Sequence, residues 1–247
     1  MKISIITVCR NSQNTIQDCI DSVRDQIYPN IEHVIIDGNS DDKTVDIIQS
    51  NARQGLVWVS EPDRGIYDAM NKGILMSTGD VIGILNSDDF YSSKLILNEI
   101  ANTFAKNKCE SVFGDVVFVK PADVNKSVRT YSAKNWRPDK FAWGYMPPHP
   151  SFFVKKEWFD KYGLYKTDYS IAADYELLIR YLFVHRLNYI YVPIEMVKMR
   201  VGGVSTKNWK SNVILNKEIA RACKENGLYT NYLMIYSKYF AKVFEYI

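Results

Sequence analysis

Two adjacent carboxylates have the type and spacing of a metal site. Asp88 and Asp89 follow closely on an apolar run, residues 81–85, with the composition of a buried strand. Carboxylate oxygens are hard donors that suit Mg²⁺ or Mn²⁺, and these ions share their coordination with substrate phosphates. The pattern predicts that Mn²⁺ or Mg²⁺ bridges Asp88 and Asp89 to a diphosphate. The structural alternative is a turn in which Asp89 caps the next helix.

A third carboxylate ends another apolar run. Asp37 closes the predicted strand 31–37 and is expected to contact the base or ribose of a nucleotide. Asp41 and Asp42 come next, but both precede a helical apolar period, so an N-cap role suits them better. The sequence therefore assigns Asp37, and not its acidic neighbours, to the nucleotide.

Arg64 is the candidate cation of the first half. It precedes a predicted helix over residues 65–76, where its planar guanidinium can stack on a nucleotide or donate hydrogen bonds to it. A surface ion pair with Asp63 or Glu61 is the alternative. Residue types alone leave both interpretations open.

Strand-like and helical patterns alternate in the first half and would position these side chains. This alternation predicts a mostly parallel α/β sheet with helices on both faces, in which ligands bind at the carboxyl ends of the strands. We expect the chemistry-bearing residues to meet at that edge. The expected strands are residues 3–8, 31–37, 56–60 and 81–85, and the expected helices are 16–27, 43–52 and 65–76.

The pattern loosens after residue 106, where a strand over 111–119 and a helix over 172–184 are expected. We expect one catalytic domain (1–205) followed by a C-terminal helical extension (206–247). Within the catalytic domain, residues 1–105 form a nucleotide-binding half and residues 106–205 an acceptor-side half.

Composition excludes several other classes of protein. A net charge of +3 over 247 residues is too small to indicate nucleic-acid binding. The 4 cysteines are scattered, which fits reduced thiols better than a zinc site or a disulfide framework. No charged leader and no run of about 18 apolar residues occurs, so we expect a cytoplasmic protein that does not span a membrane.

Five ordered blocks resemble the family 2 glycosyltransferases with the GT-A (Rossmann-like) fold that assemble bacterial capsule, exopolysaccharide and lipopolysaccharide. The resemblance covers roughly residues 1–200. It implies that Thr7, Cys9 and Asp37 line the base pocket, that Arg64 guards it, and that Asp88 and Asp89 hold ribose and metal. The blocks are Ile5 to Asn11, Asp37 to Asp42, Asp63 to Gly73, Asn86 to Asp89 and Ala173 to Arg180.

The resemblance also implies a catalytic base. Asp174 matches it and lies in the first turn of a predicted helix, where backbone N–H groups favour an ionised carboxylate. A purely structural N-terminal carboxylate is the alternative. His149 resembles an acceptor-side segment, with a packed loop histidine as the alternative, and Arg200 is placed to reach the diphosphate.

The sequence departs from the family pattern at three points. Asn86 stands where the metal motif often begins with a carboxylate, and Ala173 stands where an acid usually precedes the base. Near Arg200 no histidine occurs as a further metal ligand. The expected metal site therefore depends on Asp88 and Asp89.

Together these features predict an inverting hexosyltransferase that moves a sugar from a nucleotide-diphosphate sugar, a UDP-sugar, to a glycan or lipid-linked acceptor in cell-envelope polysaccharide biosynthesis. The alternatives are a catalytically silent nucleotide- or glycan-binding scaffold and a nucleotidyltransferase. The latter is disfavoured because no Gly-rich, Lys-containing loop follows the first strand. The amphipathic segment 232–247 either contacts the inner face of the plasma membrane or packs on the body.

Overall fold

The structure, a computed structural model, describes residues 1–202 and 209–242. Its strands are β1 (Ile3–Cys9), β2 (Ile31–Asp37), β3 (Leu56–Ser60), β4 (Val81–Ile84), β5 (Phe90–Tyr91), β6 (Ser111–Lys120), β7 (Asp123–Tyr131), β8 (Phe153–Lys155) and β9 (Tyr189–Arg200). Its helices are α1 (Ile16–Arg24), α2 (Thr44–Ser50), α3 (Ile66–Met76), α4 (Ile96–Lys106), α5 (Glu157–Tyr162), α6 (Ala173–Leu178), α7 (Trp209–Glu225) and α8 (Tyr232–Lys242), with 3₁₀ segments η1 (Pro138–Trp143) and η2 (His149–Ser151) and a π-helix η3 (Ile179–Val184).

The strands form one sheet with a parallel half and a mixed half. The parallel half has the order β3-β2-β1-β4, and Ile3 of β1 lies opposite Ile31 on one side and Val81 on the other. Every residue of β1 is buried, as expected for a strand covered on both faces. The α/β arrangement predicted for the first half is therefore confirmed.

The mixed half extends the sheet beyond β4. There β8 pairs antiparallel with β4 and β6, whereas β9 runs parallel to β6 and antiparallel to β5. The strand expected over 111–119 corresponds to β6, and β7 pairs antiparallel with β6 at the side. The second half thus adds strands of both directions to the parallel core.

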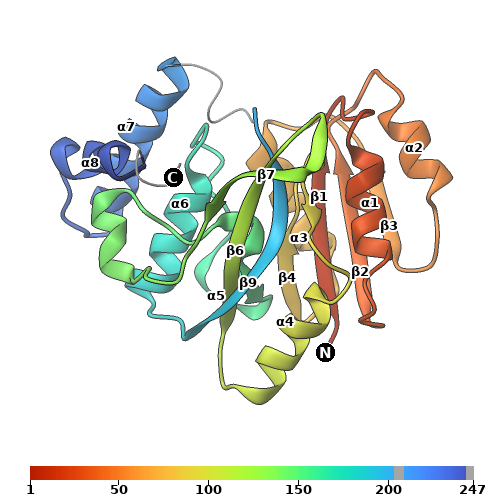
Figure 1. The fold of residues 1–247 in the computed structure, drawn as a ribbon, viewed down its shortest axis with the longest axis horizontal. Helices are drawn as coiled ribbons and strands as arrows, with labels where there is room; N and C mark the ends of the chain where they lie inside the picture. Colours follow the sequence, from red (N-terminus) through yellow and green to blue (C-terminus); the bar gives the residue numbers. More distant parts are fainter. Residues whose placement is uncertain (203–208, 243–247) are drawn as a thin grey trace.

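Helices cover both faces of the sheet. On one face α1 and α4 pack on β1 and β4 through a cluster that includes Cys19, Val23 and Ile100. On the other face α3, α6 and α7 share a larger cluster that includes Met70, Leu177 and Ile219. Figure 1 shows α7 and α8 beside α6 at one end of the molecule, with α1 and α2 at the opposite end.

The helix expected over 172–184 has two parts. Residues Ala173–Leu178 are α-helical, and Ile179–Val184 continue as a π-helix. A π-helical turn widens the backbone hydrogen-bond ring, and such turns frequently occur at functional sites. Hydrophobic periodicity predicts the helix but not this change of ring size.

The C-terminal helix α8 both packs on the body and exposes an apolar face. Ile235 and Lys238 are buried, whereas Leu233 and Tyr236 are exposed. The rest of the predicted amphipathic stripe, from Phe240 onward, lies outside the described side chains. Within residues 1–202 and 209–242, no helix has the length and apolar character needed to traverse a bilayer.

Candidate active site

The loops that follow β1 and β2 are joined at the carboxyl edge of the sheet. Asn11 and Asn39 have positive φ, 51° and 58°, a conformation that asparagine tolerates better than most residues. Ser40 accepts a hydrogen bond at Oγ from the Asn11 N–H at 2.8 Å, and the Asp41 N–H donates to Asn11 Oδ1 at 3.0 Å. These contacts fix the rim of the crevice in which a ligand is expected.

Asp37 lies at this edge, but its carboxylate is fully buried. It accepts hydrogen bonds from the Ser40 N–H at 2.9 Å and the Ser60 hydroxyl at 2.7 Å, and Cys9 donates its thiol at 3.5 Å. Burial, and then the charge of Asp37, raises the pKa of the Cys9 thiol well above its usual range. Asp37 therefore holds the ends of β1, β2 and β3 together and shapes the crevice wall.

Thr7 does not reach the crevice. Its side chain is fully buried, and its hydroxyl hydrogen-bonds to His33 Nε2 at 2.9 Å with Cys19 Sγ at 3.5 Å. Thr7 has the same parity as Ile5 along β1, so both point toward α1. The structure thus brings Cys9 to the edge of the sheet and leaves Thr7 beneath it.

The acidic loop after β4 presents Asp88 and Asp89. The Asp89 N–H donates to the Asn86 carbonyl at 3.0 Å, which closes a turn, and β5 follows directly. The alternative that Asp89 caps a following helix is therefore wrong, because the next helix begins only at Ile96. Asp88 is half-buried, and Asp89 is 1% exposed.

The surroundings of Asp89 disfavour its charge. Burial, followed by repulsion from Asp88, raises the pKa of Asp89 well above its usual range. The Asn86 amide N–H donates to Asp89 Oδ2 at 3.3 Å, yet the amide oxygen of Asn86 is buried with no hydrogen-bond partner. The loop thus brings several carboxylate and amide oxygens together without enough positive charge nearby to balance the carboxylates.

These donors fit a divalent cation. No group of three or more His, Cys, Asp or Glu side chains with metal-site geometry occurs among residues 1–202 and 209–242. Asp88 and Asp89 are the two carboxylates that the acidic loop offers. The unpartnered Asn86 oxygen is a further hard donor. Mg²⁺ and Mn²⁺ suit such open oxygen sites, since water and substrate phosphates complete their coordination.

Arg200, at the end of β9, holds the acidic loop in place. Its Nη1 donates to the Asp88 carbonyl at 2.6 Å, and its Nη2 pairs with Asp18 of α1. The guanidinium lies 4.9 Å from the centre of the Phe90 ring. Arg200 therefore lies beside the predicted metal site, where it anchors the loop.

Arg64 lies at the mouth of the same edge. Its side chain is 82% exposed and pairs with Asp68 at 3.0 Å, not with Asp63 or Glu61 as the surface-pair alternative expected. Because the Arg64 side chain itself is largely in solvent, this ion pair contributes little to stability, and Arg64 can reorient toward a ligand at small cost.

Asp174 lies at the first turn of α6 and meets the first turn of α3. Its Oδ1 accepts the Tyr175 N–H at 2.8 Å, and the Tyr67 hydroxyl approaches the same oxygen at 3.5 Å. Its second oxygen, Oδ2, accepts no hydrogen bond from another residue in the described part of the chain. Because α3 starts just after the carboxyl end of β3, this contact places Asp174 at the ligand-binding edge.

The ionisation of Asp174 differs from the expectation. Burial raises its pKa to about 6, and the backbone N–H groups of Tyr175 and Asp174, which lower it, do not compensate. The predicted N-terminal N–H contacts exist, but desolvation outweighs them. A carboxylate with this pKa is a better proton acceptor than an ordinary surface aspartate near neutral pH.

His149 is a packed histidine. It is 6% exposed, its Nε2 lies 2.7 Å from the Tyr165 hydroxyl, and burial lowers its pKa to about 4. Tyr165 in turn stacks on Tyr67, with ring centres 5.9 Å apart. His149 therefore supports the wall beside Tyr67 and Asp174, and the structure gives it no direct contact with the carboxylate.

Sequence reasoning missed two residues of this site. Tyr67 falls within the block Asp63 to Gly73, but nothing in the sequence marks it as a neighbour of Asp174. Glu218 of α7 accepts three backbone N–H groups from the loop that leads to Asp174. Because Glu218 lies far from Asp174 along the chain, no local sequence pattern links the two residues.

The acidic loop at the carboxyl edge of the parallel strands and the half-buried Asp174 on α6 have the layout expected of a glycosyltransferase with the GT-A fold. The chain belongs to the family described as glycosyl transferase family 2, whose model matches residues 4–163. That match includes Asp88 and Asp89 and ends before Asp174.

Relatives in other organisms agree with this membership. An uncharacterised glycosyltransferase of Mycobacterium tuberculosis is 31% identical over 181 residues, which is 72% of this chain and 68% of that protein. A PGL/p-HBAD biosynthesis glycosyltransferase of Mycobacterium bovis is 26% identical over 223 residues, 88% of this chain and 82% of that one.

Solved structures share the fold. Staphylococcus aureus TarS (residues 1–349) in complex with UDP-GlcNAc matches with a TM-score of 0.70 at 17% identity, covering 93% of this chain and 68% of that one. The mannosyltransferase PcManGT of Pyrobaculum calidifontis, with GDP-Man and Mn²⁺, matches with a TM-score of 0.65 at 20% identity, covering 89% and 64%. The predicted GT-A fold is confirmed.

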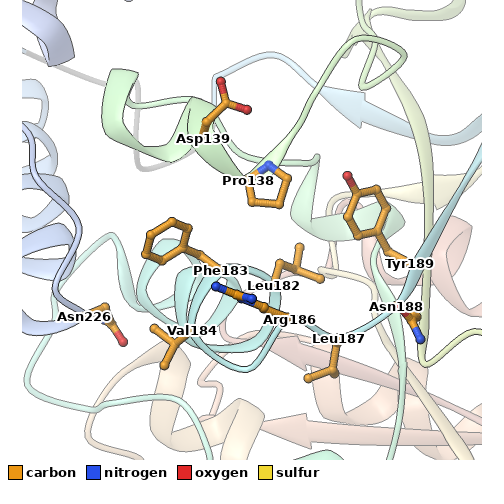
Figure 2. A pocket seen from close by; sticks show the side chains of 10 residues that line it. All are labelled: Pro138, Asp139, Leu182, Phe183, Val184, Arg186, Leu187, Asn188, Tyr189 and Asn226. Carbon is orange, nitrogen blue, oxygen red and sulfur yellow. The ribbon is translucent and has the colours of Figure 1, made fainter.

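A cavity lies away from this edge of the sheet. Its volume is about 640 Å³, and Figure 2 shows its lining from η1, η3 and the segment around Arg186 to Tyr189, with Asn226 at the end of α7. None of its lining residues belongs to the acidic loop or contacts Asp174. The site assignment therefore depends on chemistry and position at the sheet edge, not on cavity size.

Proposed function

We propose that this glycosyltransferase is an inverting, divalent-metal-dependent enzyme that transfers a sugar from a UDP-sugar to a hydroxyl of a glycan or lipid-linked acceptor in polysaccharide biosynthesis. The observation that carries the proposal is the acidic pair of half-buried Asp88 and buried Asp89 beside the unpartnered Asn86 oxygen. Such a group of oxygens is unfavourable in isolation and becomes favourable when a cation and a diphosphate complete it.

Asp174 acts as the base in this proposal. Its Oδ2 accepts the proton of the acceptor hydroxyl while the hydroxyl oxygen attacks the anomeric carbon from the side opposite the diphosphate. The Tyr175 N–H donates to Oδ1, and this bond fixes the direction of the second oxygen. One displacement at the anomeric carbon inverts its configuration.

The donor is held on the first-half side. The wall shaped by Asp37 and Cys9 binds the base, and Arg64 closes over it by leaving its exposed pair with Asp68. Asp88 and Asp89 hold ribose and metal, and a bound Mn²⁺ or Mg²⁺ would supply Lewis-acid stabilisation of the departing diphosphate. Arg200 links the acidic loop to α1 through the Asp88 carbonyl and Asp18.

The donor prediction is tested by thermal shift. With Mn²⁺ present, UDP is expected to raise the melting temperature by roughly 5–10 °C at a hundredfold excess over Kd, because it binds only the folded state. GDP is expected to give a much smaller shift, and EDTA should remove the UDP effect. A larger shift with GDP would reassign the donor to the GDP-sugars.

Product analysis tests the reaction. Release of UDP in the presence of Mn²⁺ and an acceptor extract supports sugar transfer, whereas binding without turnover would favour a silent scaffold. Release of pyrophosphate would favour nucleotidyl transfer. The family membership supports the first outcome.

A peripheral contact with the inner face of the plasma membrane is part of the proposal. Tyr232, Leu233 and Tyr236 of α8 are exposed, with Leu233 at 86%, and the nearby Tyr229 is 77% exposed. Tyrosine and leucine side chains suit the headgroup boundary of a bilayer, where a lipid-linked acceptor would be found.

Substitution of Leu233 tests this contact. Leu233→Glu is expected to reduce co-sedimentation with phosphatidylglycerol-containing vesicles about tenfold, because the buried leucine contribution is lost and the added charge is repelled. Leu75→Glu, at another exposed leucine near the end of α3 (67% exposed), is the matched control and should leave sedimentation unchanged. Equal sedimentation of both variants and the wild type would contradict membrane contact through α8.

A further inference from the structure

The loop that leads into α6 is held by a carboxylate from the C-terminal part of the chain. Glu218 of α7 accepts the Ser170 N–H on Oε1 at 2.7 Å, and the N–H groups of Ile171 and Ala172 on Oε2 at 2.9 and 2.8 Å. Hydrogen bonds to an ionised acceptor are stronger than those between neutral groups. Three consecutive backbone donors thus end on one side chain, two residues before Asp174.

Helix α6 depends on this contact because its own N-terminus has no side-chain cap. Ala172 occupies the N-cap position and offers no oxygen to the first turn. On the other side of the loop, the Tyr67 hydroxyl donates to the Ile171 carbonyl. Tyr67, through the Ile171 carbonyl, and Glu218, through the Ala172 N–H, therefore hold opposite sides of the same peptide unit.

Helix α7 contacts the preceding residues of the loop through the same face. Glu225, seven positions after Glu218, pairs with Lys166 at 2.8 Å and accepts the Tyr169 hydroxyl at 3.0 Å. Arg221, between them, ion-pairs with Asp168. The face of α7 that carries Glu218, Arg221 and Glu225 thus lies along the whole segment that precedes Asp174.

We propose that Glu218 is a positioning residue for the catalytic carboxylate: it fixes the backbone from which Asp174 projects and places a negative charge near it. The proposal depends on the base role given to Asp174 above. It makes α7 part of the active site, although the family match ends at residue 163.

The charge of Glu218 has a measurable consequence. Burial is the main cause that raises the pKa of Asp174 to about 6, and the nearby charge of Glu218 raises it further. Glu225 is not among the causes of this shift, although it holds the same loop. Loss of the Glu218 charge should therefore lower the pKa of Asp174, whereas loss of the Glu225 charge should not.

The test compares Glu218→Gln with Glu225→Gln as the matched control. The full-length protein is labelled with ¹³C at the aspartate carboxyl carbons, and the resonance missing in Asp174→Asn is followed against pH. Glu218→Gln is expected to lower the pKa of Asp174, and Glu225→Gln is expected to leave it at the wild-type value. A pKa that Glu218→Gln does not change overturns the proposal, even if that variant melts at a lower temperature.

Kinetics add a second readout. With a UDP-sugar as donor, Glu218→Gln should lower kcat about 10-fold to 100-fold with little change in the KM for the donor, since misplacement of the base affects the reacting geometry. If Glu218→Gln does not fold, Glu218→Asp, which keeps the charge but is shorter, is expected to lower kcat at least tenfold, and a wild-type kcat overturns the proposal. Full activity of Asp174→Asn would refute the base role, while the NMR titration would still report the coupling between Glu218 and Asp174.

Discussion

Replacement of Asp174 with asparagine is expected to lower the rate of sugar transfer about 10³-fold while leaving UDP binding largely intact. General bases typically contribute about 10²-fold to 10⁴-fold, and the asparagine amide retains the shape and the contact with the Tyr175 N–H but cannot accept the proton. The measurement is kcat for transfer together with the UDP-dependent thermal shift. Turnover near the wild-type rate would refute the base assignment.

The pH dependence gives an independent check. Because Asp174 acts in its ionised form and its pKa is raised to about 6, kcat should increase as the pH rises through about 6 and level off above it. Asp160→Asn, an exposed aspartate on α5, is the control and should keep the wild-type profile.

Stability separates loss of chemistry from loss of fold. The folded-state pKa of Asp174 lies above the unfolded value of about 4, so ionisation costs stability as the pH rises from about 4 to about 6, and that stability is not regained at higher pH. Asp174→Asn removes this cost. At pH 7.5 the variant is expected to melt at or above the wild-type temperature, so an inactive but stable variant identifies a catalytic defect.

The first half of the fold could be predicted because its strands are buried on both faces. Nearly continuous apolar runs such as residues 3–8 identify a central parallel strand directly, and polar residues at the run ends then mark the ligand edge. The acidic loop of Asp88 and Asp89 was found in this way. Strand β9 has half-buried side chains and a proline, so its pattern resembles neither a buried nor an alternating strand.

The environment of individual side chains could not be predicted. The position of Asp174 at the start of a helix predicts a lowered pKa. Burial by segments far away in the chain raises that pKa instead. Residue spacing likewise shows neither that Thr7 turns toward His33 nor that Asp37 is enclosed by Ser40 and Ser60. Each of these outcomes depends on contacts between segments far apart in the chain.

The second large effect is expected at the acidic loop. Asp89→Asn should abolish the Mn²⁺-dependent thermal shift by UDP and lower transfer by at least 10²-fold, because the variant loses a charged metal ligand while Asp88 alone remains. Asp46→Asn, an exposed aspartate on α2, is the control and should behave as the wild type. Isothermal titration of UDP with and without Mn²⁺ measures the effect directly.

The same substitution should have the opposite effect on the metal-free protein. Asp89 is 1% exposed beside Asp88, so without a cation burial and repulsion disfavour its charged form and raise its pKa, which costs stability at neutral pH. Asp89→Asn removes that cost, and its melting temperature in EDTA should equal or exceed that of the wild type. A structural carboxylate would give the reverse, since its removal would destabilise the protein with or without metal. A lower melting temperature in EDTA together with an unchanged Mn²⁺ response would therefore exclude Asp89 as a metal ligand.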